Sequence, residues 1–210
     1  MAEHDFDTVA SETVYVGKIF AVRADEVRMP GGATARRDVV EHFGAVAVVA
    51  LDSEDNIVLV YQYRHAVGRR LLELPAGLLD IDGEAPHLTA ARELQEEVGL
   101  QATRWSVLVD VDSAVGFCDE SVRVFLATEL SDVGRPDAHH EEADLTVERV
   151  PLQKAVQMVL AGEIVNSIAV SGILAAHTLR REGITPRGLD APWPDKPSDF
   201  AHRVAAGGGA

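Results

Sequence analysis

A short acidic segment carries the residues whose types and spacing could do chemistry. Residues 88–98 read LTAARELQEEV, with glutamates at positions 93, 96 and 97. Residues four apart on a helix lie about 40° apart around its axis, so Glu93 and Glu97 share one face and Glu96 lies beside them. Hard divalent cations such as Mg²⁺ or Mn²⁺ bind carboxylate oxygens and would relieve the repulsion within this cluster. The alternative is an amphipathic surface helix with a solvated acidic face.

The rest of the helix and the loop before it favour the metal-binding interpretation. Apolar residues recur on the opposite side of the helix and would anchor it on a sheet. They are Leu88, Ala91, Leu94 and Val98. Gly99 then ends the helix. Upstream, residues 73–84 (ELPAGLLDIDGE) end a strand, turn and lead back into the helix.

The segment from Gly77 to Leu100 resembles the Nudix box, GX5EX7REUXEEXGU, in which U is a bulky aliphatic residue. Gly77 opens the motif, Glu84 follows, and RELQEEVGL at residues 92–100 matches every fixed position of the second half. Six residues instead of five separate Gly77 from Glu84. Loops absorb such insertions at little cost, so the resemblance is kept.

The resemblance implies an α/β/α sandwich in which the box forms a loop, a helix and a second loop. It implies ligands for Mg²⁺ or Mn²⁺ at Glu93 and Glu97, with Glu96 nearby. Arg92 would orient these glutamates by ion pairing. The other motif residues with an implied structural role are Gly77, Glu84 and Gly99.

A weaker resemblance to the ADP-ribose pyrophosphatase branch covers about residues 12–176. It rests on RRDVVEH (36–42), on QYR (62–64) followed by ELPAG (73–77), and on residues 162–176. It implies that the backbone carbonyl of Ala76 also binds metal. The implied substrate-binding residues are Arg37, Arg64, Glu73 and Glu120. An arginine suits phosphate oxygens because its planar fork matches them, although each arginine could equally be a surface charge.

Two further features concern the resemblance to the ADP-ribose pyrophosphatase branch. Val115 stands where the branch usually has a proline, which leaves the substrate more open than the reaction. The acidic loop at residues 138–144 (AHHEEAD) lies where the family has its catalytic loop. A general base must reach the attacking water directly or through one intermediary, and Glu142 is the first choice for that role, with Glu141 the second.

Composition limits the partners and the compartment. The chain of 210 residues has a net charge of −15, which disfavours nucleic acid and leaves a small nucleotide as the expected partner. A bound cation would offset this charge locally. The longest clean apolar run, residues 45–51, is far too short to span a membrane, and the acidic N-terminus does not resemble a secretory signal. With the single cysteine Cys118, these features predict a cytoplasmic protein.

Periodicity predicts an α/β fold around a mixed sheet, with an N-terminal extended β region. Strands are expected at residues 13–29, 37–42, 44–51, 57–63, 105–112, 121–130 and 146–150, and helices at 88–98, 152–160 and 164–182. The resulting division is an N-terminal β arm (1–42), a Nudix hydrolase domain (43–182) and an irregular C-terminal tail (183–210). The branch resemblance implies a homodimer in which the arm is exchanged.

The resulting hypothesis is metal-dependent hydrolysis of a nucleoside diphosphate derivative at its pyrophosphate. The expected reaction converts ADP-ribose to AMP and ribose 5-phosphate. One alternative keeps the chemistry but changes the substrate to another nucleotide sugar, NADH or a dinucleoside polyphosphate. A second alternative is a catalytically silent Nudix module that binds nucleotide, which the intact Glu93, Glu96 and Glu97 disfavour. A third, a purely structural acidic domain, requires the box match to be accidental.

Overall fold

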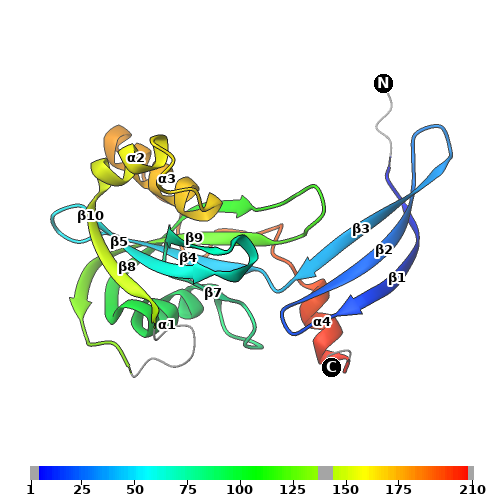
Figure 1. The fold of residues 1–210 in the computed structure, drawn as a ribbon, viewed down its shortest axis with the longest axis horizontal. Helices are drawn as coiled ribbons and strands as arrows, with labels where there is room; N and C mark the ends of the chain where they lie inside the picture. The colour runs from blue at the N-terminus through cyan, green and yellow to red at the C-terminus, as the bar shows by residue number, and fades with distance from the viewer. Residues whose placement is uncertain (1–4, 137–143, 208–210) are drawn as a thin grey trace. The chain divides into compact units, whose positions relative to one another are not determined.

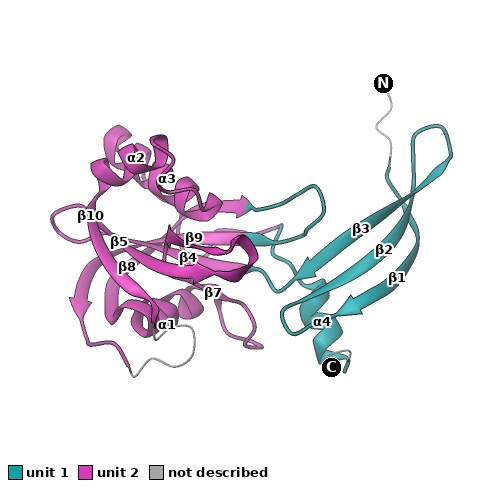
Figure 2. Cartoon of the chain, in the orientation of Figure 1, with its two compact units in different colours: residues 1–44, 112–121, 195–210 teal, residues 45–111, 122–194 magenta. Residues whose placement is uncertain are grey.

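The computed structural model describes residues 5–136 and 144–207. The chain divides into two compact units, coloured separately in Figure 2. Unit 1 comprises Met1–Gly44, Asp112–Ser121 and Asp195–Ala210, and unit 2 comprises Ala45–Val111 and Val122–Pro194. The division therefore differs from the three consecutive segments expected from the sequence, because a central loop and the C-terminal end belong with the N-terminal strands. No helix in the described ranges combines the length and apolar character needed to cross a membrane.

Unit 1 is built on a three-stranded antiparallel sheet. Its strands, in spatial order, are β1 (Thr8–Val16), β2 (Phe20–Arg28) and β3 (Thr34–His42). The single extended stretch expected at residues 13–29 is thus most of two strands joined by a turn at Gly17, where the N–H of Gly17 donates to the carbonyl of Phe20 at 2.9 Å. A turn at Pro30–Gly32 joins β2 to β3, and Gly31 and Gly32 both have positive φ there.

The C-terminal tail is more ordered than its composition predicts. Helix α4 (Asp199–Ala205) lies within the segment expected to be irregular. Its Phe200 is fully buried and meets Phe43 edge to face, with ring centroids 4.5 Å apart. Glu41, also buried, accepts hydrogen bonds from Arg23 (2.9 Å) and from Arg203 of α4 (2.7 and 2.9 Å). Aromatic packing and this ion pair therefore fix α4 within unit 1.

Unit 2 contains two sheets. The first has the order β7-β4-β9-β8, with β4 parallel to β9 and antiparallel to β7, so it is mixed as expected. Its strands are β4 (Ala45–Ala50), β7 (Ala76–Leu78), β8 (Leu100–Asp112) and β9 (Ser121–Asp132). The second sheet is antiparallel, with the order β10-β5-β6. Its strands are β5 (Asn56–Arg64), β6 (Arg69–Glu73) and β10 (Thr146–Pro151). A short 3-10 helix, η1 (His65–Val67), joins β5 to β6.

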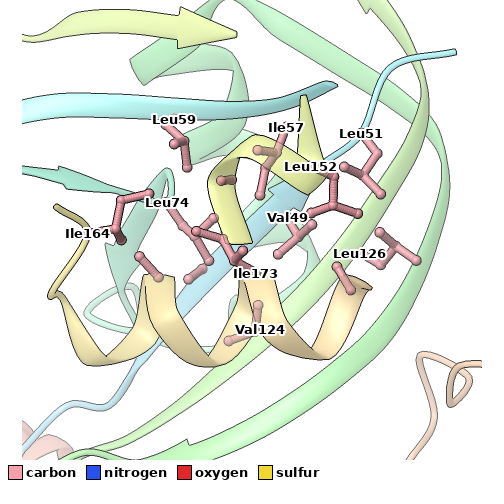
Figure 3. Close-up of a cluster of buried hydrophobic side chains, with 14 of the residues drawn as sticks. Val49, Leu51, Ile57, Leu59, Leu74, Val124, Leu126, Leu152, Ile164 and Ile173 are labelled. Atoms are coloured by element: carbon pink, nitrogen blue, oxygen red, sulfur yellow. The ribbon is translucent and has the colours of Figure 1, made fainter. Parts of the chain in front are cut away.

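Strand β4 explains the layering of unit 2, because all six of its residues are buried. Side chains alternate across a strand, so Val46, Val48 and Ala50 join the core under helix α1 (Pro86–Val98). Ala45, Ala47 and Val49 join the opposite core, under helices α2 (Leu152–Leu160) and α3 (Ser167–Glu182). Figure 1 shows helices on both faces of the sheet, and Figure 3 shows the core against α3. Unit 2 is therefore an α/β/α sandwich.

Arg123 of β9 attaches residues 191–193 to strands β8 and β9. Buried Arg123 donates to both carboxylate oxygens of Asp110 (2.7 and 3.0 Å) and to the carbonyls of Ala191 (2.9 Å) and Pro192 (2.8 Å). Its guanidinium also lies 4.7 Å from the ring centroid of Trp193. Arg123 thus holds residues 191–193 of the segment expected to be irregular against the sheet.

Candidate active site

Helix α1 presents its acidic face to strand β7. Gly99 ends the helix in the left-handed region (φ 71°), as the sequence indicated, whereas the helix begins at Pro86, two residues before the expected start. Ala90 and Leu94 are fully buried in the core beneath it, which fixes the rotation of the helix about its axis. Glu93 and Glu97 consequently project toward the β7 backbone.

Glu97 is tied to the backbone of β7. Its side chain is largely buried, with only 8% of the residue exposed. The backbone N–H of Ala76 donates to Glu97 Oε2 at 3.0 Å. A buried carboxylate needs such partners, because burying a charge without them is costly. The bond brings a carboxylate next to the residue whose carbonyl was expected to bind metal.

Glu93 lies directly over Gly77. A Cβ at position 77 would be 2.1 Å from Glu93 Oε1 and 2.4 Å from its Cγ, which no side chain could occupy. The opening glycine of the motif therefore makes room for a glutamate of the helix. Ala76, Gly77, Glu93 and Glu97 are thus brought together from two segments about 20 residues apart.

Arg92 forms hydrogen bonds with three glutamates of the box. Its guanidinium donates to Glu93 (2.7 Å), Glu96 (3.1 Å) and both oxygens of Glu84 (3.1 and 3.3 Å). Glu84 also accepts a hydrogen bond from the Thr89 hydroxyl at 2.8 Å. The hydrogen bonds from Arg92 and Thr89 hold the pKa of Glu84 below its usual value. The extra residue before Glu84 therefore does not remove it from Arg92.

The electrostatics at Glu93 favour a cation. Burial raises the pKa of Glu93, the nearby carboxylates of Glu96 and Asp80 add to this, and Arg92 only partly opposes it. Arg92 itself has a raised pKa, chiefly through its bond to Glu84, so its charge is permanent. A cation with hard-oxygen preference would stabilise the ionised form of Glu93.

The donor set fits a magnesium-like ion that keeps open positions. Within the described ranges, no three acidic, histidine or cysteine side chains are arranged to hold a metal by themselves. Two carboxylates and one backbone carbonyl would hold it instead, from Glu93, Glu97 and Ala76. Such a partial set suits Mg²⁺, which usually retains waters and takes its other ligands from substrate phosphates.

A second polar group lies on neighbouring strands β5 and β6. Glu73 is almost fully buried and accepts hydrogen bonds from Arg64 (Nη2 at 2.6 Å, Nε at 3.1 Å) and from Gln62 (3.2 Å). The Arg64 side chain remains 46% exposed. Glu73 therefore acts on Arg64 by orienting it, and an oriented, half-exposed guanidinium is suited to a phosphate.

The other expected site residues belong to unit 1 or fall outside the described residues. Arg37 and Glu120 belong to unit 1, where Arg37 donates to the carbonyl of Arg36 (2.9 Å) and Glu120 contacts the Ser113 hydroxyl and His42. Val115 is exposed in the loop between β8 and β9. Glu141 and Glu142 lie outside the described residues.

The chain matches the sequence patterns of two known domain families. The sequence pattern of the NUDIX domain matches residues 41–166, more than half of the chain. The chain belongs to the Nudix family. The Nudix box is therefore the segment that carries Gly77, Glu84, Arg92, Glu93 and Glu97 in this protein. A second pattern, the nucleoside diphosphate sugar hydrolase N-terminal domain, matches residues 6–40.

Individual relatives indicate which members of the Nudix family this chain resembles. This Nudix protein is 64% identical over 205 residues to the ADP-ribose pyrophosphatase of Mycobacterium tuberculosis, covering 98% of this chain and 99% of that one. It is 38% identical over 157 residues to the ADP-ribose pyrophosphatase of Bacillus subtilis, covering 75% and 84%. The crystal structure of an ADP compounds hydrolase has the same fold, with a TM-score of 0.74 and 21% identity over 87% of this chain and 98% of that one.

Three further polar residues of unit 2 make contacts that the sequence did not indicate. Gln62 supports Glu73, and Asp80 adds negative charge beside Glu93. Arg70, on β6, contacts Asp144 through its carboxylate and its carbonyl. Asp80 lies inside the motif and could have been weighed with the other acids, whereas nothing in the local sequence distinguishes Arg70 from a surface arginine.

Proposed function

We propose that this Nudix enzyme hydrolyses ADP-ribose to AMP and ribose 5-phosphate. The observation that carries the proposal is the meeting of Glu93 and Glu97 at the backbone of Ala76 and Gly77. It is the arrangement needed to hold a divalent cation against a diphosphate. The choice of ADP-ribose rests on relatives of that name, one of them matched over almost its whole length.

The proposed cation is Mg²⁺ or Mn²⁺, held by the Ala76 carbonyl, Glu93 and Glu97, with Glu96 close by. When bound, it would neutralise diphosphate charge, polarise the phosphorus and lower the pKa of the attacking water. Arg92 keeps the Glu93 carboxylate in place, and the Ala76 N–H does the same for Glu97. These contacts orient the ligands before substrate binds. A site that is already ordered does not have to reorganise during the reaction.

The bond changes are those of a hydrolysis. The water oxygen forms a bond to one phosphorus, and the bond from that phosphorus to the bridging oxygen breaks. The bridging oxygen leaves with the other phosphate. In this proposal Glu142 takes the proton from the water, with Glu141 as the second candidate.

The proposed substrate contacts extend beyond the metal. Arg64, oriented by buried Glu73, would bind the diphosphate or its sugars, while Glu73 would also approach the base or ribose. Arg37 and Glu120 of unit 1 are the remaining proposed substrate residues. Each is a polar side chain suited to hydroxyls or phosphate oxygens.

We also propose that the enzyme is a cytoplasmic homodimer in which the N-terminal strands take part in the interface. Strand β1 is an edge strand, and its Val9, Val14 and Tyr15 are exposed. An exposed edge with apolar side chains is a surface that proteins usually cover. A single cysteine is in keeping with a reducing compartment.

A substrate panel with product identification tests the proposal. ADP-ribose, a GDP-sugar, NADH and a dinucleoside polyphosphate are compared by kcat/KM in the presence of Mg²⁺. We expect ADP-ribose to have the highest value. A higher value for another compound would leave the reaction class intact but reject the substrate, and binding of all four without turnover would favour the silent module.

A further inference from the structure

The first turn of helix α1 begins without a side-chain cap. Ala85 occupies the cap position, makes no capping bond with its side chain, and is followed by Pro86. The backbone N–H groups of Leu88 and Thr89 both donate to the Ala85 carbonyl, at 2.8 and 3.2 Å. Because no capping side chain fixes the entry to the helix, the position of Glu84 just before it depends on contacts of its own carboxylate.

Two side chains of α1 hold the Glu84 carboxylate, Thr89 and Arg92. Thr89 Oγ1 donates to Glu84 Oε2 at 2.8 Å, and Arg92 donates to Oε2 at 3.1 Å and to Oε1 at 3.3 Å. The contact with the hydroxyl is the shortest of the three. Thr89 is fully buried, and a buried hydroxyl needs a hydrogen-bond partner, which Glu84 supplies.

The helix itself therefore determines where Glu84 lies. Thr89 and Arg92 are three residues apart, so they lie on the same face of α1. A carboxylate bonded to both is placed relative to that face, whatever the length of the loop that leads to it. This accounts for the contact between Glu84 and Arg92 even though six residues separate Glu84 from Gly77.

The orientation of Arg92 determines how strongly its charge competes with a cation. Its Nη1 donates to Glu93 at 2.7 Å and to Glu96 at 3.1 Å, while its Nε and Nη2 donate to Glu84. If Glu84 moved away, the guanidinium could rotate and pair with Glu93 through two parallel hydrogen bonds. Such a pair would occupy the carboxylate oxygens that the proposed cation needs.

We propose that Thr89 is a positioning residue of the metal site, which acts through Glu84 and Arg92 on Glu93. This inference rests on the proposed function, in which Glu93 is a metal ligand. Position 89 is one of the seven positions that the Nudix box leaves unspecified between Glu84 and Arg92. The Thr89 hydroxyl keeps Glu84 bonded to one edge of the guanidinium, and the guanidinium then leaves Glu93 able to bind the cation.

The first test measures binding of Mn²⁺ alone to the full chain, from the EPR signal of the free ion. Thr89→Val keeps the shape of the side chain but removes the hydroxyl, whereas Thr89→Ser keeps the hydroxyl. We expect the Kd for Mn²⁺ to rise about 5-fold in Thr89→Val, less than the roughly 10- to 100-fold typical when a direct partner of a metal ligand is lost. Thr89→Ser should retain most of the affinity.

The second test measures Mg²⁺-dependent hydrolysis of ADP-ribose by the same variants. In Thr89→Val the Mg²⁺ concentration for half-maximal activity should rise by the factor found for Mn²⁺, while kcat at saturating Mg²⁺ changes little. The matched control is Thr103→Val, which removes the hydroxyl that donates to Glu129 at 2.6 Å in an exposed pair of strands β8 and β9. It should match the unaltered chain in both tests.

A double variant separates positioning from a general loss of structure. If Thr89 acts through Glu84, adding Thr89→Val to Glu84→Ala should raise the Kd for Mn²⁺ no further, because residues acting as a unit are not additive. Full additivity, a lower Tm with unchanged Mn²⁺ affinity in Thr89→Val, or an equal loss in Thr103→Val would overturn the positioning role.

Two further outcomes are also decisive. If Thr89→Val does not fold, Thr89→Ala removes the same hydroxyl with a smaller side chain and is judged by the same comparisons. If the unaltered chain binds no Mn²⁺ and does not hydrolyse ADP-ribose, the proposed function is rejected before any variant is made, and the role of Thr89 is rejected with it.

Discussion

The backbone N–H of Ala76 donates a hydrogen bond to the carboxylate of Glu97 at 3.0 Å, joining strand β7 to helix α1. This bond places two proposed metal ligands side by side, the Glu97 carboxylate and the Ala76 carbonyl. The N–H that donates to Glu97 and the proposed carbonyl ligand belong to the same residue, Ala76. The bond also fixes the buried Glu97 side chain through a backbone donor. The site is therefore assembled by backbone contacts as much as by charges.

Removing either proposed metal ligand should abolish most activity while the fold survives. Glu93→Gln and Glu97→Gln keep the shape of the side chain but lose its charge. We expect kcat to fall by about two to four orders of magnitude, since the cation supplies several kcal/mol of transition-state stabilisation. Steady-state assays at saturating Mg²⁺, with Tm as the check on folding, measure this. Near-normal turnover in both variants would reject the metal assignment.

Gly77→Ala should displace the Glu93 carboxylate while leaving the Glu93 side chain itself unaltered. The added methyl group would lie 2.1 Å from Glu93 Oε1, so the carboxylate must move away from β7. We expect a higher Mg²⁺ concentration for half-maximal activity and a lower kcat. Gly116→Ala is the matched control, because a Cβ there meets nothing within 4 Å. Equal behaviour of the two alanine variants would mean that Gly77 is not needed for the position of Glu93.

The motif and its neighbours differ in how far sequence could predict them. The box residues were predictable because Glu93 and Glu97 share a helix face and residues 92–100 match the second half of the motif. The contacts of Arg123 with residues 191–193 and the position of helix α4 were not predictable. Both depend on contacts between residues far apart in the chain. Phe200 packs on Phe43, and Arg203 reaches Glu41 across 162 positions. A tail rich in glycine and proline gives no local sign of such partners.

Low pH should destabilise unit 1 through Glu41. Burial opposes its ionisation, but hydrogen bonds from Arg203 and Arg23 outweigh burial and hold the pKa of Glu41 below its ordinary 4.5. A lowered pKa means that the ionised form stabilises the fold above that value, and that this stability is lost as the pH falls through the folded-state pKa. Glu41→Gln should therefore be less stable at neutral pH and show a shallower decline in Tm between about pH 6 and 3.

The comparison for Glu41 is Glu12→Gln, which alters an exposed carboxylate on strand β1 of the same unit. It should follow the wild-type pH profile. If Glu41→Gln and Glu12→Gln have identical profiles, the two arginines do not stabilise the fold through Glu41.

The N-terminal strands should be required for assembly. Deleting residues 1–42 removes β1, β2 and β3, and with them the exposed apolar edge of β1. We expect a monomeric or insoluble chain with little activity, whereas the full chain should sediment as a dimer. Full activity of the complete chain as a monomer would contradict the shared interface.

The metal dependence of ADP-ribose turnover in the unaltered protein is the sharpest test of the proposed hydrolysis. The reaction is run after chelation with EDTA and again after Mg²⁺ is restored, and its products are identified by mass spectrometry. We expect no turnover with EDTA and, with Mg²⁺, AMP and ribose 5-phosphate in equal amounts. Turnover that survives chelation, or no cleavage of the pyrophosphate with Mg²⁺ present, would contradict it.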